Sequence, residues 1–194
     1  MATPESQERP ESLESPETPQ TRSPTAKPAQ HQALEGRAAE LVRDLGLQPH
    51  PEGGWYHELF RSSASVLPDD GRPARSGLTS IDFLLVQGQF SAWHRVLSDE
   101  VWHLLEGPAL TLWLLPFEAP AQKQAQRISL QSSTRLRHVV PAGWWQAAEP
   151  AGALAYAGAT VGPGFDFKDF SFGRDDPTLC EALRSQHPQL LRLL

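Results

Sequence analysis

One stretch of the sequence decides the fold: GQFSAWHRVLSDEVWHLLEG, residues 88–107. Apolar and polar residues alternate on both sides of its middle, which predicts two strands, 89–96 and 100–106. Alternate residues of a strand share a face, so Glu100 and Trp102 are expected on one side of the second strand. We expect the two strands to form a hairpin that sets His94 beside Glu100 in the mouth of a barrel. The glycines at both ends of the stretch allow the turns.

Similar alternation continues through most of the chain. It predicts about ten short strands between Trp55 and Phe172, bounded by Gly, Pro and Asp. The expected strands are 55–61, 78–86, 89–96, 100–106, 109–116, 126–130, 135–140, 144–148, 153–160 and 166–172. Because no helical period interrupts them, the sequence predicts an all-β fold, a double-sheet roll or barrel.

Short helices are expected on both sides of the barrel. Apolar residues at helical spacing run from Leu34 to Leu45 and are followed by Gly46, a typical C-cap. This helix is expected to lie outside the barrel and cover a sheet edge. Asp176 and Pro177 are typical of the start of a second helix. The apolar end, residues 190–194, is expected to pack on the barrel or on a second subunit.

The chain divides into a tail, residues 1–30, and a barrel domain, residues 31–194. The tail alternates Pro with Glu, Ser, Thr and Gln and has almost no large aliphatic residue. Such a segment cannot bury enough surface to offset its ordering entropy, so we predict that it is disordered. It would serve as a solvated extension or as an arm that contacts a partner.

Composition excludes several classes of function. The formal net charge is −6, and phosphate binding needs a basic stripe, so no nucleic-acid partner is expected. The N-terminus lacks the apolar run of a signal peptide, and no stretch is long and apolar enough for a bilayer, so no membrane partner is expected. The single cysteine, Cys180, excludes an internal disulfide. We therefore expect a cytoplasmic protein.

The spacing within residues 88–107 resembles the first motif of the cupin superfamily. Gly88, His94, Glu100 and Gly107 stand in register with that motif, whereas Val96 takes the place of its second histidine. The second cupin motif is represented by PAGWWQ, residues 141–146, in which glutamine replaces the histidine ligand. The resemblance implies a jelly-roll barrel.

Six blocks in order make the chain similar to the cupin 5 group, a domain of unknown function. They span about residues 35–173 and are HPEGGWY (50–56), TSI (79–81), FSAWHRV (90–96), SDEVWH (98–103), VPAGWWQ (140–146) and GATVGPGFDF (158–167). The resemblance implies a homodimer and implies that Val96 and Gln146 are the usual residues of the group. It implies no established reaction.

Two readings of the central residues stay open. In the first, His94, Glu100 and Gln146 hold a divalent metal ion, although catalytic sites normally present three or more His or carboxylate ligands. In the second, which the ligand count favours, no cofactor is present. His94 and Glu100 then form a catalytic acid–base pair, similar to metal-free sugar epimerases on related jelly rolls. A third reading makes the pair purely structural.

The remaining candidates would line a ligand pocket. Tyr56, Glu58, Arg61 and Gln146 would orient polar groups of a small-molecule ligand, and Trp102 and Trp144 would form an apolar wall. Asp166 and Asp169 are expected on opposite faces of one strand, so at most one faces the pocket.

The sequence thus predicts a protein that binds a small polar metabolite, with a metal-independent isomerase or epimerase as the leading interpretation. The alternatives are a divalent-metal-dependent enzyme and a non-enzymatic ligand-binding or scaffold module.

Overall fold

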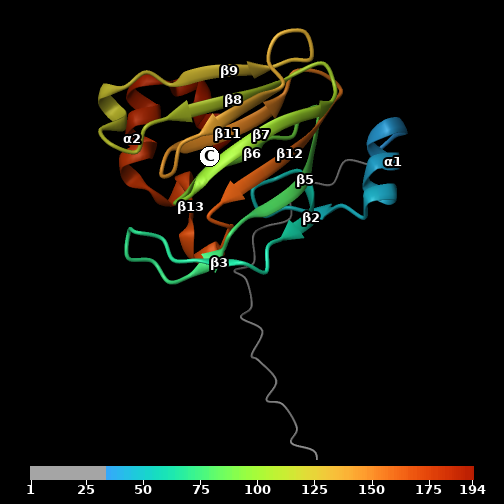
Figure 1. Cartoon of the computed structure of the whole chain (residues 1–194). Coiled ribbons are helices and arrows are strands. Elements are labelled where there is room, and N and C mark those ends of the chain that lie inside the picture. The colour runs from blue at the N-terminus through green and yellow to red at the C-terminus, as the bar shows by residue number, and fades with distance from the viewer. Residues whose placement is uncertain (1–33) are drawn as a thin grey trace, which may run out of the picture.

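Two antiparallel sheets enclose the core in the computed structural model, which describes residues 34–194 (Figure 1). A six-stranded sheet has the order β1-β2-β5-β12-β7-β10, and a five-stranded sheet has the order β13-β6-β11-β8-β9. A further pair, β3-β4, stands apart from both sheets. The all-β roll predicted from the alternation is confirmed. The predicted disordered tail, residues 1–30, lies outside the described residues.

The elements have the following bounds. The strands are β1 (Gln48–Pro49), β2 (Trp55–Arg61), β3 (Ser65–Val66), β4 (Arg75–Ser76), β5 (Thr79–Val86), β6 (Ser91–Val96), β7 (Asp99–Glu106), β8 (Leu110–Leu115), β9 (Gln126–Leu130), β10 (Arg137–Val140), β11 (Trp145–Pro150), β12 (Leu154–Gly162) and β13 (Phe170–Phe172). The α-helices are α1 (Gly36–Leu45) and α2 (Pro177–Gln186). The 3-10 turns are η1 (Pro120–Gln122), η2 (Phe167–Asp169), η3 (Gly173–Asp175) and η4 (Pro188–Leu193).

The core between the sheets follows from the period of two in the strands. In β12, Ala155, Ala157 and Ala159 are buried, while the residues between them are only partly buried. These alanines pack with Phe83 and Leu85 of β5 and with residues of the facing sheet. Alternate side chains of a strand point to opposite faces. The alanines of β12 therefore fill the barrel interior, while the residues between them lie on the outer face of the sheet.

The two α-helices pack on the outside of the barrel and lie on opposite sides of it in Figure 1. Helix α1 ends at Gly46, which takes the left-handed conformation that the sequence predicted. It packs on Leu84 and Val86, on the outer face of β5, and not on a sheet edge as expected. Among residues 34–194, no helix combines the length and the apolar character that crossing a membrane requires.

The C-terminal elements cover the other sheet. Asp176 Oδ1 accepts a hydrogen bond of 2.7 Å from Leu179 N and caps α2, as predicted. Leucines of α2 and η4 pack on Trp93 and Trp145, both almost fully buried. The burial of each such leucine contributes about 2 kcal/mol. The apolar C-terminal end therefore packs on the barrel of its own chain.

Two local predictions are wrong. The predicted hairpin does not form, because β6 pairs with β11 and β13 whereas β7 pairs with β10 and β12 of the other sheet. The predicted strand 166–172 is a strand only from Phe170. Before it, Asp166 Oδ1 accepts from Lys168 N at 2.9 Å and turns the chain into η2. Asp166 and Asp169 consequently do not lie on opposite faces of one strand.

Candidate functional site

His94 and Glu100 lie on strands of opposite sheets. Gln146 lies beside His94 on the neighbouring strand and forms a hydrogen bond with Glu100. His94 on β6 stands in register with Gln146 on β11. The Gln146 side chain reaches across the barrel and donates from Nε2 to Glu100 Oε2 at 2.5 Å. His94 and Gln146 are each 2% exposed, and Glu100 is 6% exposed. The site is therefore inside the barrel, with one ionisable group on each sheet.

A turn before β2 places a second carboxylate beside His94. Gly53 and Gly54 both have positive φ, 110° and 73°. A Cβ on Gly53 would come within 2.2 Å of Phe90 O, and one on Gly54 within 2.7 Å of Leu84 O. The two glycines allow the turn to lie directly on the sheets, and Ala92 N donates to Glu52 O at 2.9 Å. The sequence analysis missed Glu52 as a site residue.

The Glu52 carboxylate fixes the orientation of the His94 ring. Glu52 Oε2 lies 3.1 Å from His94 Nδ1 and accepts a hydrogen bond of 2.6 Å from Ser91 Oγ. His94 Nδ1 also lies 2.8 Å from Ala92 O. Both neighbours of Nδ1 are acceptors, so the neutral ring carries its proton on Nδ1 and leaves the lone pair on Nε2. Within residues 34–194, Nε2 makes no hydrogen bond or ion pair.

A β-bulge in β6 allows Ser91 and His94 to contact the same carboxylate. The register of β6 with β11 shifts between Gln146 and Ala148, so His94 pairs with Gln146 and Ser91 pairs with Ala148. Residues three apart in a regular strand would point to opposite faces, and the bulge removes that constraint.

Glu100 is the terminus of a buried hydrogen-bond chain. Trp102 Nε1 donates to Gln146 Oε1 at 2.9 Å, and Gln146 Nε2 donates to Glu100. Indole nitrogen is only a donor, so it fixes which end of the amide faces Glu100. Burial raises the pKa of Glu100 to about 7, against the opposing effects of His94 and of the Gln146 hydrogen bond. At neutral pH Glu100 is poised between its acid and its base form.

His50 completes the buried cluster of ionisable groups. Its Nδ1 accepts a hydrogen bond of 3.3 Å from Glu52 N and lies 3.7 Å from Glu52 Oε1. Its ring meets Tyr56 and Phe83 edge-on, at centroid distances of 4.5 and 5.5 Å. Burial lowers the pKa of His50, so His50 stays neutral around pH 7. The charged partner available to the Glu52 carboxylate in this cluster is therefore His94.

Residues 163–172, which we name the cover segment, lie over His94. The Phe170 ring stacks on the imidazole at a centroid distance of 5.5 Å. Asp169 is buried and pairs with Arg72 and Arg75, whereas Asp166 is only partly buried. Of the two aspartates whose orientation the sequence left open, Asp169 is thus the one held inside.

Four predicted ligand-binding residues lie around this cluster in different ways. Tyr56 contacts the cluster through His50, and Trp144 packs at the edge of the core between the sheets. Glu58 and Arg61 do not join it: they form an exposed ion pair of 2.6 Å with each other on β2. Arg61 also donates to Phe165 O at 3.0 Å. Its contact with the site is therefore through the cover segment.

The predicted metal ligands, His94, Glu100 and Gln146, do not fit a resident metal ion. Gln146 Oε1 accepts from Trp102, so the amide presents no free oxygen beside Glu100. The described residues contain no group of three or more His, Cys, Asp or Glu arranged to hold an ion. Of the three predicted ligands only His94 and Glu100 are good donors, fewer than a catalytic metal site normally presents.

Sequence reasoning also missed His50, Ser91, Arg72 and Arg75. A signal for His50 was present, because His50 and Glu52 directly precede the pair Gly53-Gly54 in one of the six blocks. Strand alternation placed Ala92 on the His94 face and thereby hid Ser91. Nothing in the local sequence indicated that Arg72 and Arg75 meet Asp169, about a hundred residues away.

The two sheets, with His94 and Glu100 at the positions of the cupin motif, define a cupin barrel. The chain belongs to the Cupin 5 family of the cupin superfamily (DUF985), whose sequence profile matches residues 39–173. This result confirms the family and the jelly-roll fold implied by the resemblance.

Two solved structures are similar over most of their length. A hypothetical protein from Leishmania major is 28% identical, with a TM-score of 0.70, and the match covers 81% of this chain and 97% of that one. A protein from Shewanella oneidensis is 27% identical, with a TM-score of 0.65, and the match covers 82% and 95%. No curated protein matches this chain.

Proposed function

We propose that this protein binds a small polar metabolite between His94 and Glu100 and transfers protons on it without a metal ion, as an isomerase or epimerase. One observation carries the proposal: a histidine whose Nδ1 is held by a carboxylate lies on one sheet, and a carboxyl group with its pKa raised to about 7 lies on the other. Groups on opposite sheets reach opposite faces of a bound molecule.

The chemistry follows from the states of the two groups. His94 Nε2 accepts a proton from a carbon next to a carbonyl group, and the electron pair of the broken C–H bond delocalises onto that carbonyl. The protonated form of Glu100 then donates its proton to the opposite face of the same carbon. The product is the inverted epimer, with a protonated His94 and an ionised Glu100. After the product leaves, His94 releases its proton to water and Glu100 takes one up from water, which restores both groups. A positioned base and a carboxylic acid whose pKa is about 7 suit this step.

Glu52 acts as a positioning residue in this scheme. As His94 takes a proton, the imidazolium gains a carboxylate partner at 3.1 Å, which stabilises the charge inside the barrel. Gln146 holds Glu100 by its own hydrogen bond. Trp102 and Gln146, both predicted to contact the ligand, thus support the reacting groups.

The test is a thermal-shift screen of small hydroxy-, keto- and sugar-acid metabolites, followed by proton NMR of each hit in D₂O. We expect a saturable rise in Tm for a hit and exchange of one carbon-bound proton for deuterium. The exchange should disappear in H94Q and fall in E100Q. Unchanged stabilisation in H94A would overturn the assignment of the pocket. If a metabolite stabilises the native protein but none of its protons exchanges, the protein is a ligand-binding module and the proposed enzyme activity is wrong.

A metal arm of the same screen tests the alternative cofactor. The measurements are repeated with EDTA and with added Mn²⁺, and we expect no change in the exchange rate. A rate that is lost in EDTA and restored by Mn²⁺ would overturn the metal-free mechanism. The homodimer and the cytoplasmic location expected from the sequence remain predictions.

A further inference from the structure

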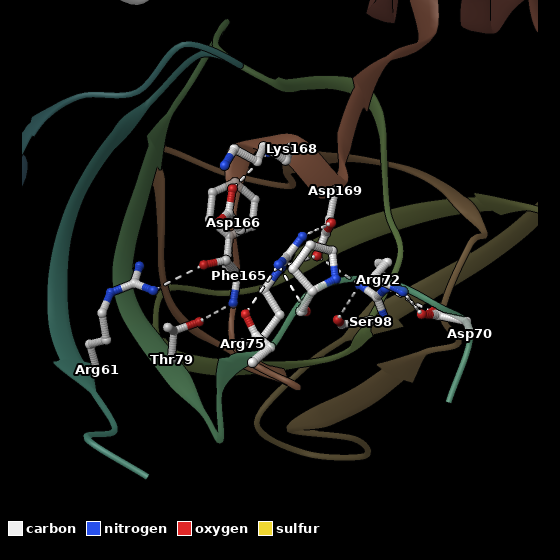
Figure 2. Close-up of polar contacts among 12 residues, drawn as sticks. Arg61, Asp70, Arg72, Arg75, Thr79, Ser98, Phe165, Asp166, Lys168 and Asp169 are labelled. Atoms are coloured by element: carbon white, nitrogen blue, oxygen red, sulfur yellow. Dashed lines mark hydrogen bonds and ion pairs between the residues drawn. The ribbon is translucent and has the colours of Figure 1, made fainter. Parts of the chain in front are cut away.

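Two arginines, the buried Arg75 and the partly buried Arg72, converge on one carboxylate of the cover segment (Figure 2). Arg75 donates from Nε to Asp169 Oδ2 at 2.8 Å and from Nη2 to Oδ1 at 2.7 Å. Arg72 donates from Nη1 to Oδ2 at 2.7 Å. Arg75 is 7% exposed and Asp169 is 4% exposed. The pair thus presents three charge-assisted donors to a single carboxylate.

Other contacts hold the two guanidinium groups in place without Asp169. Arg75 Nη1 donates to Pro73 O at 3.0 Å and to Ala74 O at 3.2 Å. Arg72 donates from Nε to Asp70 Oδ2 at 2.7 Å and from Nη1 to Ser98 Oγ at 3.2 Å. If Asp169 moved away, the donors would stay aimed at the same point, and a buried positive charge would need a new partner.

The carboxylate that they hold is attached to the cover of the site. Asp169 precedes Phe170, the residue whose ring stacks on His94. The outer end of the segment is held by Arg61, through Phe165 O, and by Thr79 Oγ1, which accepts from Phe165 N at 2.9 Å (Figure 2). Phe167 is 56% exposed, so its ring contributes little buried apolar surface to the segment. Asp169 is the charged attachment of the segment, beside the pairing of β13 with β6 and the backbone hydrogen bond from Gly164 N to Ser76 O.

Access to His94 requires such a segment to move. His94 is 2% exposed. Two open hollows of about 600 and 610 Å³ in the described part of the chain are lined by other residues, among them Ser132 and Arg135 in the first and Arg37 and Val86 in the second. A ligand that reaches His94 must displace part of its cover.

We propose that Arg72 and Arg75 form the carboxylate-binding subsite of the ligand, and that Asp169 occupies it until a ligand carboxylate takes its place and releases the cover segment. This inference rests on the proposed function and narrows its substrate to small carboxylic acids. A planar carboxylate matches the side-by-side donors of Arg75, and replacement of one carboxylate by another keeps the charge of the cluster unchanged.

Chemical rescue tests the subsite. D169A removes the internal carboxylate, and sodium acetate is the probe that can fill the space between the arginines. We expect acetate to raise the Tm of D169A saturably, by about 3 °C at ten times its Kd, with no rise from sodium chloride at equal ionic strength. The matched control is D166A, because Asp166 accepts only from Lys168 N and forms no ion pair with an arginine in residues 34–194. No difference between acetate and chloride in D169A would overturn the subsite.

A second variant covers the case in which D169A does not fold. D169N keeps the shape of the side chain and loses its charge. We expect at least tenfold faster hydrogen exchange at the amides of residues 165–172, with the amides of β5 unchanged, because the segment has lost its charged attachment. Acetate added to the native protein should accelerate the same amides. Exchange that is unchanged in both experiments would overturn the release of the cover segment.

The rescue separates this inference from the proposed function. In the double variant D169A/H94A, acetate should still raise the Tm, because the arginines bind it without His94. Suppose that acetate rescues D169A but metabolite binding is the same with and without His94. The carboxylate subsite would then stand, and the proposed function would be overturned. Metabolite binding that depends on His94 without any rescue would overturn the subsite alone.

Discussion

The carboxylate of Glu52 lies 3.1 Å from Nδ1 of His94, and the two residues come from a turn before β2 and from the middle of β6. Together with Ala92 O, this oxygen determines which nitrogen of the neutral ring carries the proton. The orienting carboxylate of His94 is thus Glu52, and Glu100 is left free to act as a separate acid. Each group can be tested on its own.

Replacement of Glu52 by Gln should disturb the His94 tautomer. An amide can turn either its oxygen or its nitrogen toward Nδ1, so a second tautomer should become visible in the ¹⁵N NMR spectrum of the imidazole. The loss of the charge-assisted hydrogen bonds should lower the free energy of unfolding by about 1–3 kcal/mol. S91A is the control, because Ser91 donates to the same oxygen but does not contact the ring. A single unchanged tautomer in E52Q would show that Ala92 O alone orients the ring.

Glu100 should make the protein less stable as the pH rises through neutrality. Its pKa is about 7 in the folded state against an ordinary value of 4.5, so between these values the folded state holds a proton that the unfolded state has lost. The free energy of unfolding therefore falls as the pH rises through this window, and the loss is complete above it. At about 1.4 kcal/mol for each pKa unit, the total is about 3 kcal/mol.

E100Q should remove that fall, because glutamine stays neutral. Urea unfolding between about pH 5 and pH 8 should show E100Q gaining on the native protein as the pH rises. The control is E106Q, also on β7: Glu106 is partly exposed, and its hydrogen bond with Arg37 lowers its pKa, so its loss cannot flatten the profile in the same direction. Parallel profiles of E100Q and the native protein would contradict the raised pKa.

Gly53 should tolerate no side chain. It has a φ of 110°, and a Cβ there would come within 2.2 Å of Phe90 O, which is a backbone atom of the bulged region. We expect G53A to lose about 3 kcal/mol or more. G71A is the control: Gly71 has a φ of 85° with nothing within 4 Å of the added atom, so the backbone cost alone, about 1 kcal/mol, should remain. Equal urea midpoints for the two variants would refute the contact argument.

The fold could be predicted from the sequence because the two faces of a strand contact different surroundings. Residue types therefore alternate along the strand with a period of two. The span of β9, residues 126–130, was predicted without error. The period does not say which sheet a strand joins, so the hairpin of β6 and β7 was predicted wrongly. It also fails where a side chain bends the backbone, as Asp166 does before β13.

The site was predictable only in part for the same physical reason. His94, Glu100, Trp102 and Gln146 lie inward on strands, and strand parity together with the cupin spacing indicated them. Glu52 lies in a turn and enters the site through the packing of Gly53 on β6, which no local pattern reports. Ser91 enters through the β-bulge, which reverses parity within a few residues.

Trp102 should control the titration of Glu100 although the two side chains share no hydrogen bond in the described structure. Phenylalanine at this position keeps an aromatic ring but removes the donor to Gln146 Oε1, and a buried acceptor left without a partner costs about 1–3 kcal/mol. The freed amide no longer has to present Nε2 to Glu100. Since that hydrogen bond lowers the pKa of Glu100, W102F should raise it further, as a ¹³C NMR titration of the carboxyl carbon would show.

W113F provides the matched control for this prediction. Trp113 Nε1 donates to Glu149 Oε1 at 2.8 Å on the outer side of the five-stranded sheet, so the variant loses an equivalent hydrogen bond and an equivalent part of a ring. It should lose stability without moving the titration of Glu100. If W102F and W113F left the Glu100 titration equally unchanged, the Gln146 amide would be held by its own packing, and Trp102 would have only a structural role in the barrel.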